Sequence, residues 1–199
     1  MGLEEAILQA EGNQLSYSSS RDGRQLIYQT PGQAGASDLS VLPLTGDKRQ
    51  PYPFLQTRFN KVGGRFSPDG RWISYTSNES GQPEVHVAPF PNADSKSVIS
   101  TGGGTFSRWS RDGRQILYAD PSNRLMAADV DGRGATFRVG AVRPLFQRTG
   151  LGAATGSSRG NAPRKSLTLF NAKLKAIFGA FLESPCPSIS PMTFDPSRT

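Results

Sequence analysis

The sequence predicts an all-β protein built from a repeated unit of short antiparallel strands. One nine-residue phrase occurs three times, beginning at Ser20, Ser67 and Ser110, so that the starts lie 47 and then 43 residues apart. A fixed period in this range, carried by short β-segments, is typical of propeller blades. The 22 glycines and 15 prolines fit many tight turns, and a hydrophobic fraction of 35% favours small two-faced sheets over long apolar helices. We therefore expect a partial β-propeller of about three blades.

Each copy of the phrase predicts a strand, a tight turn and a second strand. In the second copy, Pro68 fixes φ at the first turn position, Asp69 suits the second, and Gly70 takes the left-handed conformation that follows. This pattern is typical of a type I turn with a glycine bulge. The equivalent turn residues in the other copies are Asp22, Gly23, Asp112 and Gly113. We interpret all six residues as structural, and the aspartates as neither acids nor metal ligands.

Two more strands complete each unit. In the strand after each turn, successive side chains alternate between the two faces of the sheet, with Ile73 and Tyr75 on one face and Ser74 on the other. A third strand is predicted over 38–44, 84–90 and 124–130, and a more polar fourth strand over 50–55, 96–100 and 137–146. Four antiparallel strands make a propeller blade. The predicted blades span about 14–55, 62–100 and 104–147, and residues 4–8 form a leftover outer strand.

The second and third copies resemble a known family. The phrase Phe-Ser-Pro-Asp-Gly-Arg-Trp-Ile-Ser-Tyr at 66–75 and the glycine-led phrase at 102–114 are similar to TolB-like (WD-repeat-like) β-propeller repeats. The segment 80–91 between them is most similar to propellers appended to bacterial serine/threonine protein kinases. The resemblance covers about residues 4–147 and implies a ring with more blades than the three found here. No kinase activity is implied, because the glycine-rich loop and the catalytic aspartate motifs are absent.

Three blades are too few for a closed ring, since propellers typically have about four to eight. The first and last blades would then expose apolar flanks, which signal a partner. A second copy could complete the propeller, the tail could cover one end, or the chain could be part of a larger bacterial protein. We favour the last alternative, because Met1 falls where a preceding blade should be ending.

The sequence changes character after residue 147. Residues 148–165 are rich in Gly, Ser and Ala and predict a flexible linker. Residues 166–183 have helical apolar spacing and three nearby lysines, which makes 166–182 a candidate for membrane contact. Disorder or an adventitious helix is preferred over membrane contact, and a short helix docked on the exposed blade end is the other alternative. Residues 184–199 carry four prolines and should be irregular. The tail could also be the product of a frameshift or a cloning junction, because the blade phrase does not return in it.

Charge and composition exclude several classes of function. The net charge is +7, but residues 150–199 hold six Lys or Arg and only two Asp or Glu. Residues 1–149 hold 17 Lys or Arg and 14 Asp or Glu. The repeats are therefore nearly balanced, and we expect no nucleic-acid partner. One cysteine and one histidine, Cys186 and His86, allow neither a disulfide nor a cysteine or multi-histidine metal site. We expect no metal and no cofactor.

A catalytic role is disfavoured. The segment 156–160 matches the G-x-S-x-G nucleophile elbow at Ser158, but it lacks the strand and helix that the mechanism needs. The only histidine lies upstream, whereas a hydrolase of that fold needs its histidine after the serine. We therefore expect no activity in this chain.

Two arginines are the candidate binding residues. Arg65 and Arg108 occupy the same repeat position, two residues before the motif serine, and the first blade has Ser18 there. Because the innermost strand of a blade lines the central channel, these arginines could form a basic wall suited to carboxylates. The alternative, which we prefer, pairs them with carboxylates of neighbouring blades.

We expect a non-catalytic module for protein or peptide interaction or sensing. The alternative is the gating propeller of a prolyl-oligopeptidase-like serine hydrolase, separated from its catalytic domain. The N-terminus starts with acidic residues and has no signal-peptide pattern, which as written predicts the cytosol, although propellers of the family are often extracytoplasmic. The ligand, the parent protein and the oligomeric state are not set by the sequence.

Overall fold

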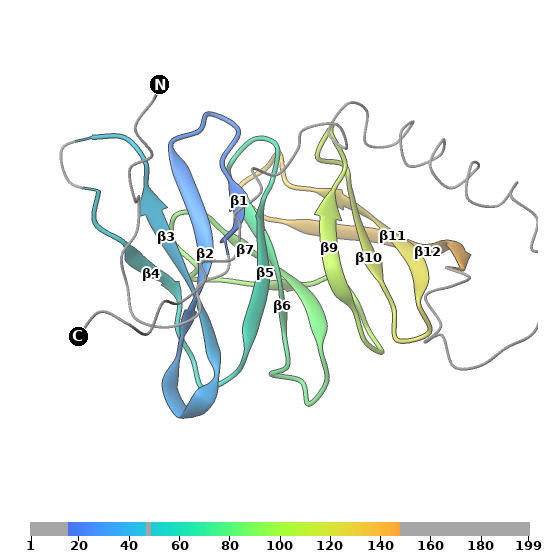
Figure 1. Ribbon diagram of the computed structural model, residues 1–199. Coiled ribbons are helices and arrows are strands. Elements are labelled where there is room, and N and C mark those ends of the chain that lie inside the picture. Colours follow the sequence, from blue (N-terminus) through green and yellow to red (C-terminus); the bar gives the residue numbers. More distant parts are fainter. Residues whose placement is uncertain (1–15, 47–48, 148–199) are drawn as a thin grey trace, which may run out of the picture. The chain divides into compact units, whose positions relative to one another are not determined.

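The computed structural model describes residues 16–46 and 49–147 of the chain, and this part is all-β, as predicted (Figure 1). Its strands form three four-stranded antiparallel sheets, which we call blades 1, 2 and 3. Blade 1 contains β1 (Ser16–Ser19), β2 (Gln25–Pro31), β3 (Ser37–Pro43) and β4 (Tyr52–Leu55), with a 3-10 turn η1 (Gln33–Gly35) between β2 and β3. Blade 2 contains β5 (Lys61–Phe66), β6 (Trp72–Ser77), β7 (Glu84–Pro89) and β8 (Ser97–Val98). Blade 3 contains β9 (Thr105–Trp109), β10 (Gln115–Ala119), β11 (Arg124–Asp131) and β12 (Arg138–Gln147).

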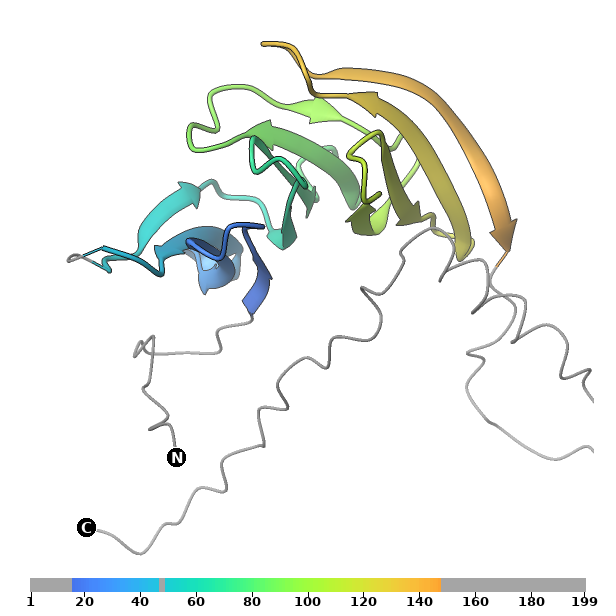
Figure 2. The same cartoon turned by 90° about the horizontal axis from the view of Figure 1, so that it is seen from above.

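The strands of each blade follow one another in chain order, so every connection within a blade joins neighbouring antiparallel strands. The innermost strands β1, β5 and β9 lie next to one another, and the view in Figure 2 shows the three blades side by side around them. This is the arrangement of propeller blades around a channel. The short β8 is the main departure from the predicted strands: Ile99 and Ser100 continue past it, and the Ser100 hydroxyl bonds to the Glu84 carboxylate.

Two apolar cores hold the blades together. The first lies between blades 1 and 2 and includes Ile27, Leu39, Phe66 and Ile73. The second lies between blades 2 and 3 and includes Trp72, Val85, Val87, Ile99, Ile116, Tyr118 and Ala128. Because both faces of blade 2 are covered, all six residues of β6 are buried. Burial between blades, at about 25 cal/mol per Å² of apolar surface, is therefore the main stabilising contribution.

The repeated turns have one geometry in all three blades. In blade 2 the Gly70 amide donates to the Ser67 carbonyl (2.9 Å), and the Ser67 amide donates to the Trp72 carbonyl (2.8 Å). The turn glycines Gly23, Gly70 and Gly113 have φ of 69°, 73° and 70°, a conformation that only glycine adopts without strain. Each turn serine donates from its hydroxyl to the turn aspartate, at 2.5 Å for Ser20–Asp22 and 2.6 Å for Ser67–Asp69 and Ser110–Asp112. These contacts give all six turn residues a structural role.

Two buried carboxylates fix the connections between strands. Asp38 on β3 accepts from the Lys61 ammonium on β5 at 3.4 Å, and the Lys61 and Asp38 side chains are 3% and 5% exposed. Glu84 on β7 accepts from the amides of Gly102 and Gly103 at 2.9 and 2.8 Å, which anchors the connection to β9. The first contact joins blade 1 to blade 2, and the second leads from blade 2 to blade 3.

Five apolar side chains outside these two cores are also buried. Tyr28 and Leu42 alternate with core residues of blade 1, and Leu117, Ala119 and Ala127 alternate with core residues of blade 3. These side chains therefore point to the faces of blades 1 and 3 that turn away from blade 2. The expectation that the first and last blades leave apolar flanks in water is wrong for these five residues, whereas Val139, Val142 and Leu145 on β12 of blade 3 are exposed.

Several predicted segments lie outside the described residues. These are the leftover strand 4–8, the linker 148–165, the helix candidate 166–183, the irregular tail 184–199, and with them Ser158 and Cys186. Within the described part of the chain, no helix is long and apolar enough to cross a membrane.

Candidate binding site at the turn end of the blades

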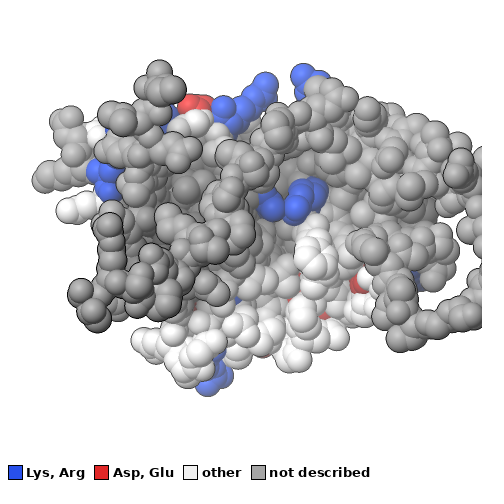
Figure 3. Space-filling view, viewed as in Figure 1, with Lys and Arg blue, Asp and Glu red and all other residues white. Residues whose placement is uncertain are grey.

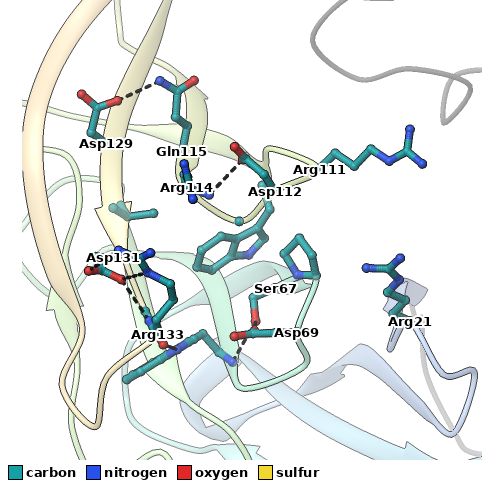
Figure 4. A pocket seen from close by; sticks show the side chains of 16 residues that line it. Arg21, Ser67, Asp69, Arg111, Asp112, Arg114, Gln115, Asp129, Asp131 and Arg133 are labelled. Carbon is teal, nitrogen blue, oxygen red and sulfur yellow. Dashed lines mark hydrogen bonds and ion pairs between the residues drawn. The ribbon is translucent and has the colours of Figure 1, made fainter.

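The three repeated turns meet around one cavity of about 870 Å³, which we call the turn-end cavity (Figure 4). Blade 1 contributes Arg21, blade 2 contributes residues 67–69 with Trp72, and blade 3 contributes residues 109 and 111–115 together with 129–133. The cavity is therefore a product of the repeat, because every blade places its motif turn at the same end. Its lining is strongly charged, with four arginines (Arg21, Arg111, Arg114, Arg133) and four aspartates (Asp69, Asp112, Asp129, Asp131).

The four aspartates of the turn-end cavity are already engaged. Asp69 and Asp112 each accept from their turn serine and from a backbone amide, and the bond from Ser110 lowers the pKa of the Asp112 carboxyl. Asp129 accepts from the Gln115 amide at 2.8 Å and from Arg143 at 2.7 Å. Hydrogen bonds from the side chain and amide of Arg133 lower the pKa of Asp131 to about 2. Hydrogen bonds from Arg143 and Gln115 likewise lower the pKa of the Asp129 carboxyl.

Three of the lining arginines form no side-chain hydrogen bond or ion pair within the described residues, and one of them, Arg114, bonds to Asp112 only through its backbone amide. Arg21 and Arg111 are exposed, and neither makes a hydrogen bond or ion pair with any residue that the structure describes. In Figure 4 both side chains lie on the same side of the view, apart from the lining residues that are joined by hydrogen bonds and ion pairs. A planar guanidinium can bind a carboxylate through two parallel hydrogen bonds. The arrangement therefore offers two available cations, from blades 1 and 3, to an anionic group.

Two tryptophans, Trp72 and Trp109, line the turn-end cavity, and Phe137 packs against both. Trp72 is 5% exposed and donates from Nε1 to the Gly132 carbonyl at 2.8 Å. Trp109 donates from Nε1 to the Arg65 carbonyl at 3.2 Å. Phe137 lies between the two indoles, with ring centroids 4.9 Å from Trp72 and 6.0 Å from Trp109. These contacts fix the positions of the two indole rings, and a binding site needs such rigid support.

The predicted binding residues Arg65 and Arg108 lie on the innermost strands β5 and β9. They pair with Ser74 and Leu117, so they occupy the same place in successive blades. Arg108 donates to the Ser107 carbonyl at 2.9 Å, and desolvation lowers the pKa of its guanidinium. Arg108 makes no ion pair with a carboxylate of the described residues, which differs from the pairing that we preferred. Figure 3 shows basic side chains near the middle of this face, in the region of β5 and β9.

Sequence reasoning missed the binding potential of Arg21 and Arg111. Both occupy the turn position where the second blade has Pro68, and turn chemistry alone gives this position no binding role. The available signal was their recurrence: two cations at one repeat position must lie at the same end of adjacent or near-adjacent blades.

The histidine is placed as a packed residue. His86 is 2% exposed and stacks on Tyr75 with ring centroids 5.4 Å apart. Its Nδ1 lies 3.4 Å from Glu79 Oε1, yet burial lowers the pKa of the His86 imidazole. Among residues 16–46 and 49–147, no group of three or more His, Cys, Asp or Glu side chains could hold a metal ion.

Comparison with known proteins identifies the fold. No protein-family model matches the chain. A putative TolB from Agrobacterium tumefaciens superimposes with a TM-score of 0.54 at 18% identity, over 69% of this chain and 52% of that one. TolB from Acinetobacter baumannii superimposes with a TM-score of 0.51 at 22% identity, over 68% of this chain and 34% of that one. The blades thus have the fold of a β-propeller segment, which the two TolB structures share, as the resemblance implied.

Curated proteins are similar over part of the sequence. Tricorn protease homolog 1 of Streptomyces coelicolor is 36% identical over 80 residues, which is 36% of this chain and 8% of that protein. The chain thus spans a small fraction of this relative and about half or less of the two TolB structures. The link to propellers appended to protein kinases stays a prediction.

Proposed function

We propose that the three blades form a non-catalytic interaction module that binds an acidic segment of a protein or peptide partner at the turn-end cavity. The observation that carries this proposal is that the acidic side chains around the cavity are hydrogen-bonded, whereas three of its basic side chains are not bonded to any described residue. Its aspartates are bonded to turn groups and arginines, whereas Arg21 and Arg111 have no bonded partner among the described residues. An acidic segment would supply the missing carboxylates.

The surroundings support a protein or peptide ligand over a small molecule. The turn-end cavity is wide, polar at its rim and contributed by loops on rigid sheets, where binding residues are commonly found. Trp109, which is partly exposed, adds aromatic surface to the lining, and tryptophan and arginine are among the side chains enriched at binding hot spots. Arg108, and Arg65 on the neighbouring innermost strand, would extend the basic surface toward the channel.

Charge reversal tests the proposal. The probe is a fluorescein-labelled peptide of sequence Gly-Asp-Glu-Ala-Glu-Asp, the acidic probe, titrated with protein and followed by fluorescence anisotropy. The double variant Arg21→Glu/Arg111→Glu should weaken binding by about tenfold or more, because two attractive contacts become repulsive. Higher salt should weaken the wild-type interaction as well.

A matched control separates a site from net charge. Arg24→Glu/Arg49→Glu changes the net charge by the same amount at two exposed arginines that do not line the turn-end cavity. This variant should bind the acidic probe about as well as the wild type. Equal weakening in both double variants would reduce the interaction to general attraction and contradict the proposed site.

A second candidate function is the accessory propeller of a serine hydrolase, which is favoured by the sequence similarity to a tricorn protease homolog. In both cases we infer that the chain belongs to a larger bacterial protein. Coding sequence for a hydrolase domain downstream would support the second candidate, and a kinase domain with one membrane span upstream would support the kinase-linked module. A second copy of the chain is the other predicted partner, and a solution mass of one chain would contradict it.

A further inference from the structure

Phe106 on β9 is in an unusual state for a large apolar residue. Its side chain is 74% exposed, more than any other large hydrophobic side chain reported for the described residues. Its backbone has φ of 57°, in the left-handed region that strongly favours glycine. An L-residue there costs about 1–2 kcal/mol, so Phe106 gains no burial and bears strain. Strain of this kind concentrates at binding and active sites.

The repeat shows what this position requires. Counting back from the motif serine, Phe106 corresponds to Gly63 of blade 2, which has φ of 69°. The pairing register shifts at this place in all three blades, between Ser16 and Ser18, between Val62 and Arg65, and opposite Leu117 and Ala119. Every innermost strand therefore contains a bulge, and in blade 2 the bulge holds Gly63, whose positive φ causes no strain. Blade 3 carries a phenylalanine instead.

The neighbours of Phe106 define a continuous surface. Ser107 is 2% exposed and bonds to Ser74 of blade 2, whereas Phe106 and Arg108 on either side of it are exposed. Strand β9 then leads through Trp109 to Arg111, both of which line the turn-end cavity. An aromatic ring and two cations thus follow one another along the innermost strand of blade 3.

We propose that Phe106 is an anchor for an apolar side chain of the partner, whose extended acidic segment runs along β9 from the turn-end cavity. The partner would place carboxylates on Arg111 and Arg108 and an apolar, preferably aromatic, side chain on the Phe106 ring. The five residue steps from Phe106 to Arg111 cover at most about 16 Å at about 3.3 Å per residue, a length that a peptide of about six residues can follow. This inference rests on the proposed function and adds a sequence requirement to it.

The test uses the acidic probe and a second peptide, Gly-Asp-Glu-Phe-Glu-Asp, the aromatic probe. Wild-type protein should bind the aromatic probe more tightly, since an aromatic pair contributes about threefold to tenfold in affinity. Phe106→Gly should remove this preference and leave binding of the acidic probe unchanged. Because glycine relieves the backbone strain, the variant should also melt at the same temperature as the wild type or higher.

Two further variants keep the outcome decisive. Val98→Ala removes an exposed apolar side chain from the outer strand β8 and should affect neither probe. Phe106→Asn also suits a positive φ, so it provides a second test if the glycine variant folds poorly. An unchanged preference in both Phe106 variants, or a lower melting temperature in both, would overturn the anchor role.

The outcomes also separate this inference from the proposed function. If Arg21→Glu/Arg111→Glu weakens both probes while Phe106→Gly changes neither, the anchor fails and the proposed site stands. If Phe106→Gly removes the aromatic preference but charge reversal has no effect, the anchor stands and the turn-end site fails. Wild-type protein that binds neither probe contradicts both.

Discussion

At the scale of single residues, hydrogen bonds decide which charged groups are available. A turn aspartate such as Asp112 is bonded to its serine and to a backbone amide, so it serves the fold. Arg111, one residue earlier, has no such bond to a described residue and is exposed. One four-residue turn therefore contains both an aspartate that stabilises the turn and an arginine that is available to a ligand.

His86 provides a prediction about pH at this scale. Burial lowers its pKa below the ordinary value of 6.5, although the nearby Glu79 acts in the opposite direction. Below about pH 6.5 the unfolded chain therefore binds more protons at this histidine than the folded chain, so the free energy of unfolding falls as the pH falls. We expect the melting temperature of wild type to drop more than that of His86→Phe between pH 7.5 and 5.5. If the melting temperatures of the two proteins fell equally with pH, His86 would not contribute to the pH dependence of stability.

At the scale of the elements, the close approach of innermost strands to the preceding blade sets the packing. Gly64 on β5 faces blade 1, and a Cβ atom there would lie 2.8 Å from Ile27 Cδ1 and 3.4 Å from Leu39 Cδ1. Both neighbours are fully buried in the first core. The blades can therefore pack this closely only because β5 lacks a side chain at this position.

A double-mutant cycle tests this contact between blades. Gly64→Ala should lower the free energy of unfolding by about 1–3 kcal/mol, because it overpacks a closed core. Ile27→Val removes the methyl group in the way, so the double variant should recover part of the loss. Urea denaturation of the four proteins measures both effects. Strictly additive losses would contradict the proposed contact.

The sequence predicted the blades well because local rules determine them. The turn geometry follows from Asp69 and Gly70, and the strands follow from alternation around residues such as Ile73 and Tyr75. The binding surface was predicted only in part, since Arg65 and Arg108 were identified but Arg21 and Arg111 were not. The bulge at Phe106 was invisible because nothing in the residues 105–109 marks a positive φ without the aligned Gly63 and the observed pairing.

At the scale of the whole described part, the repeat produces both the fold and the candidate site. Stacking the blades places three copies of one turn around a single cavity, and the differences between copies supply the chemistry. Blade 2 has Pro68 where blades 1 and 3 have arginine, so the available cations stand at the two sides of the cavity. Repetition builds the scaffold, and departures from the repeat mark the binding residues.

The central claim is the location of the acidic partner, and hydrogen–deuterium exchange measured by mass spectrometry tests it most directly. With saturating aromatic probe, amides in the segments 20–24 and 105–113 should exchange more slowly, because the probe covers the turns of blades 1 and 3 and the strand β9. Amides of the outer strands β4, β8 and β12 should be unaffected. Protection confined to these outer strands, with none at residues 105–113, would contradict the account.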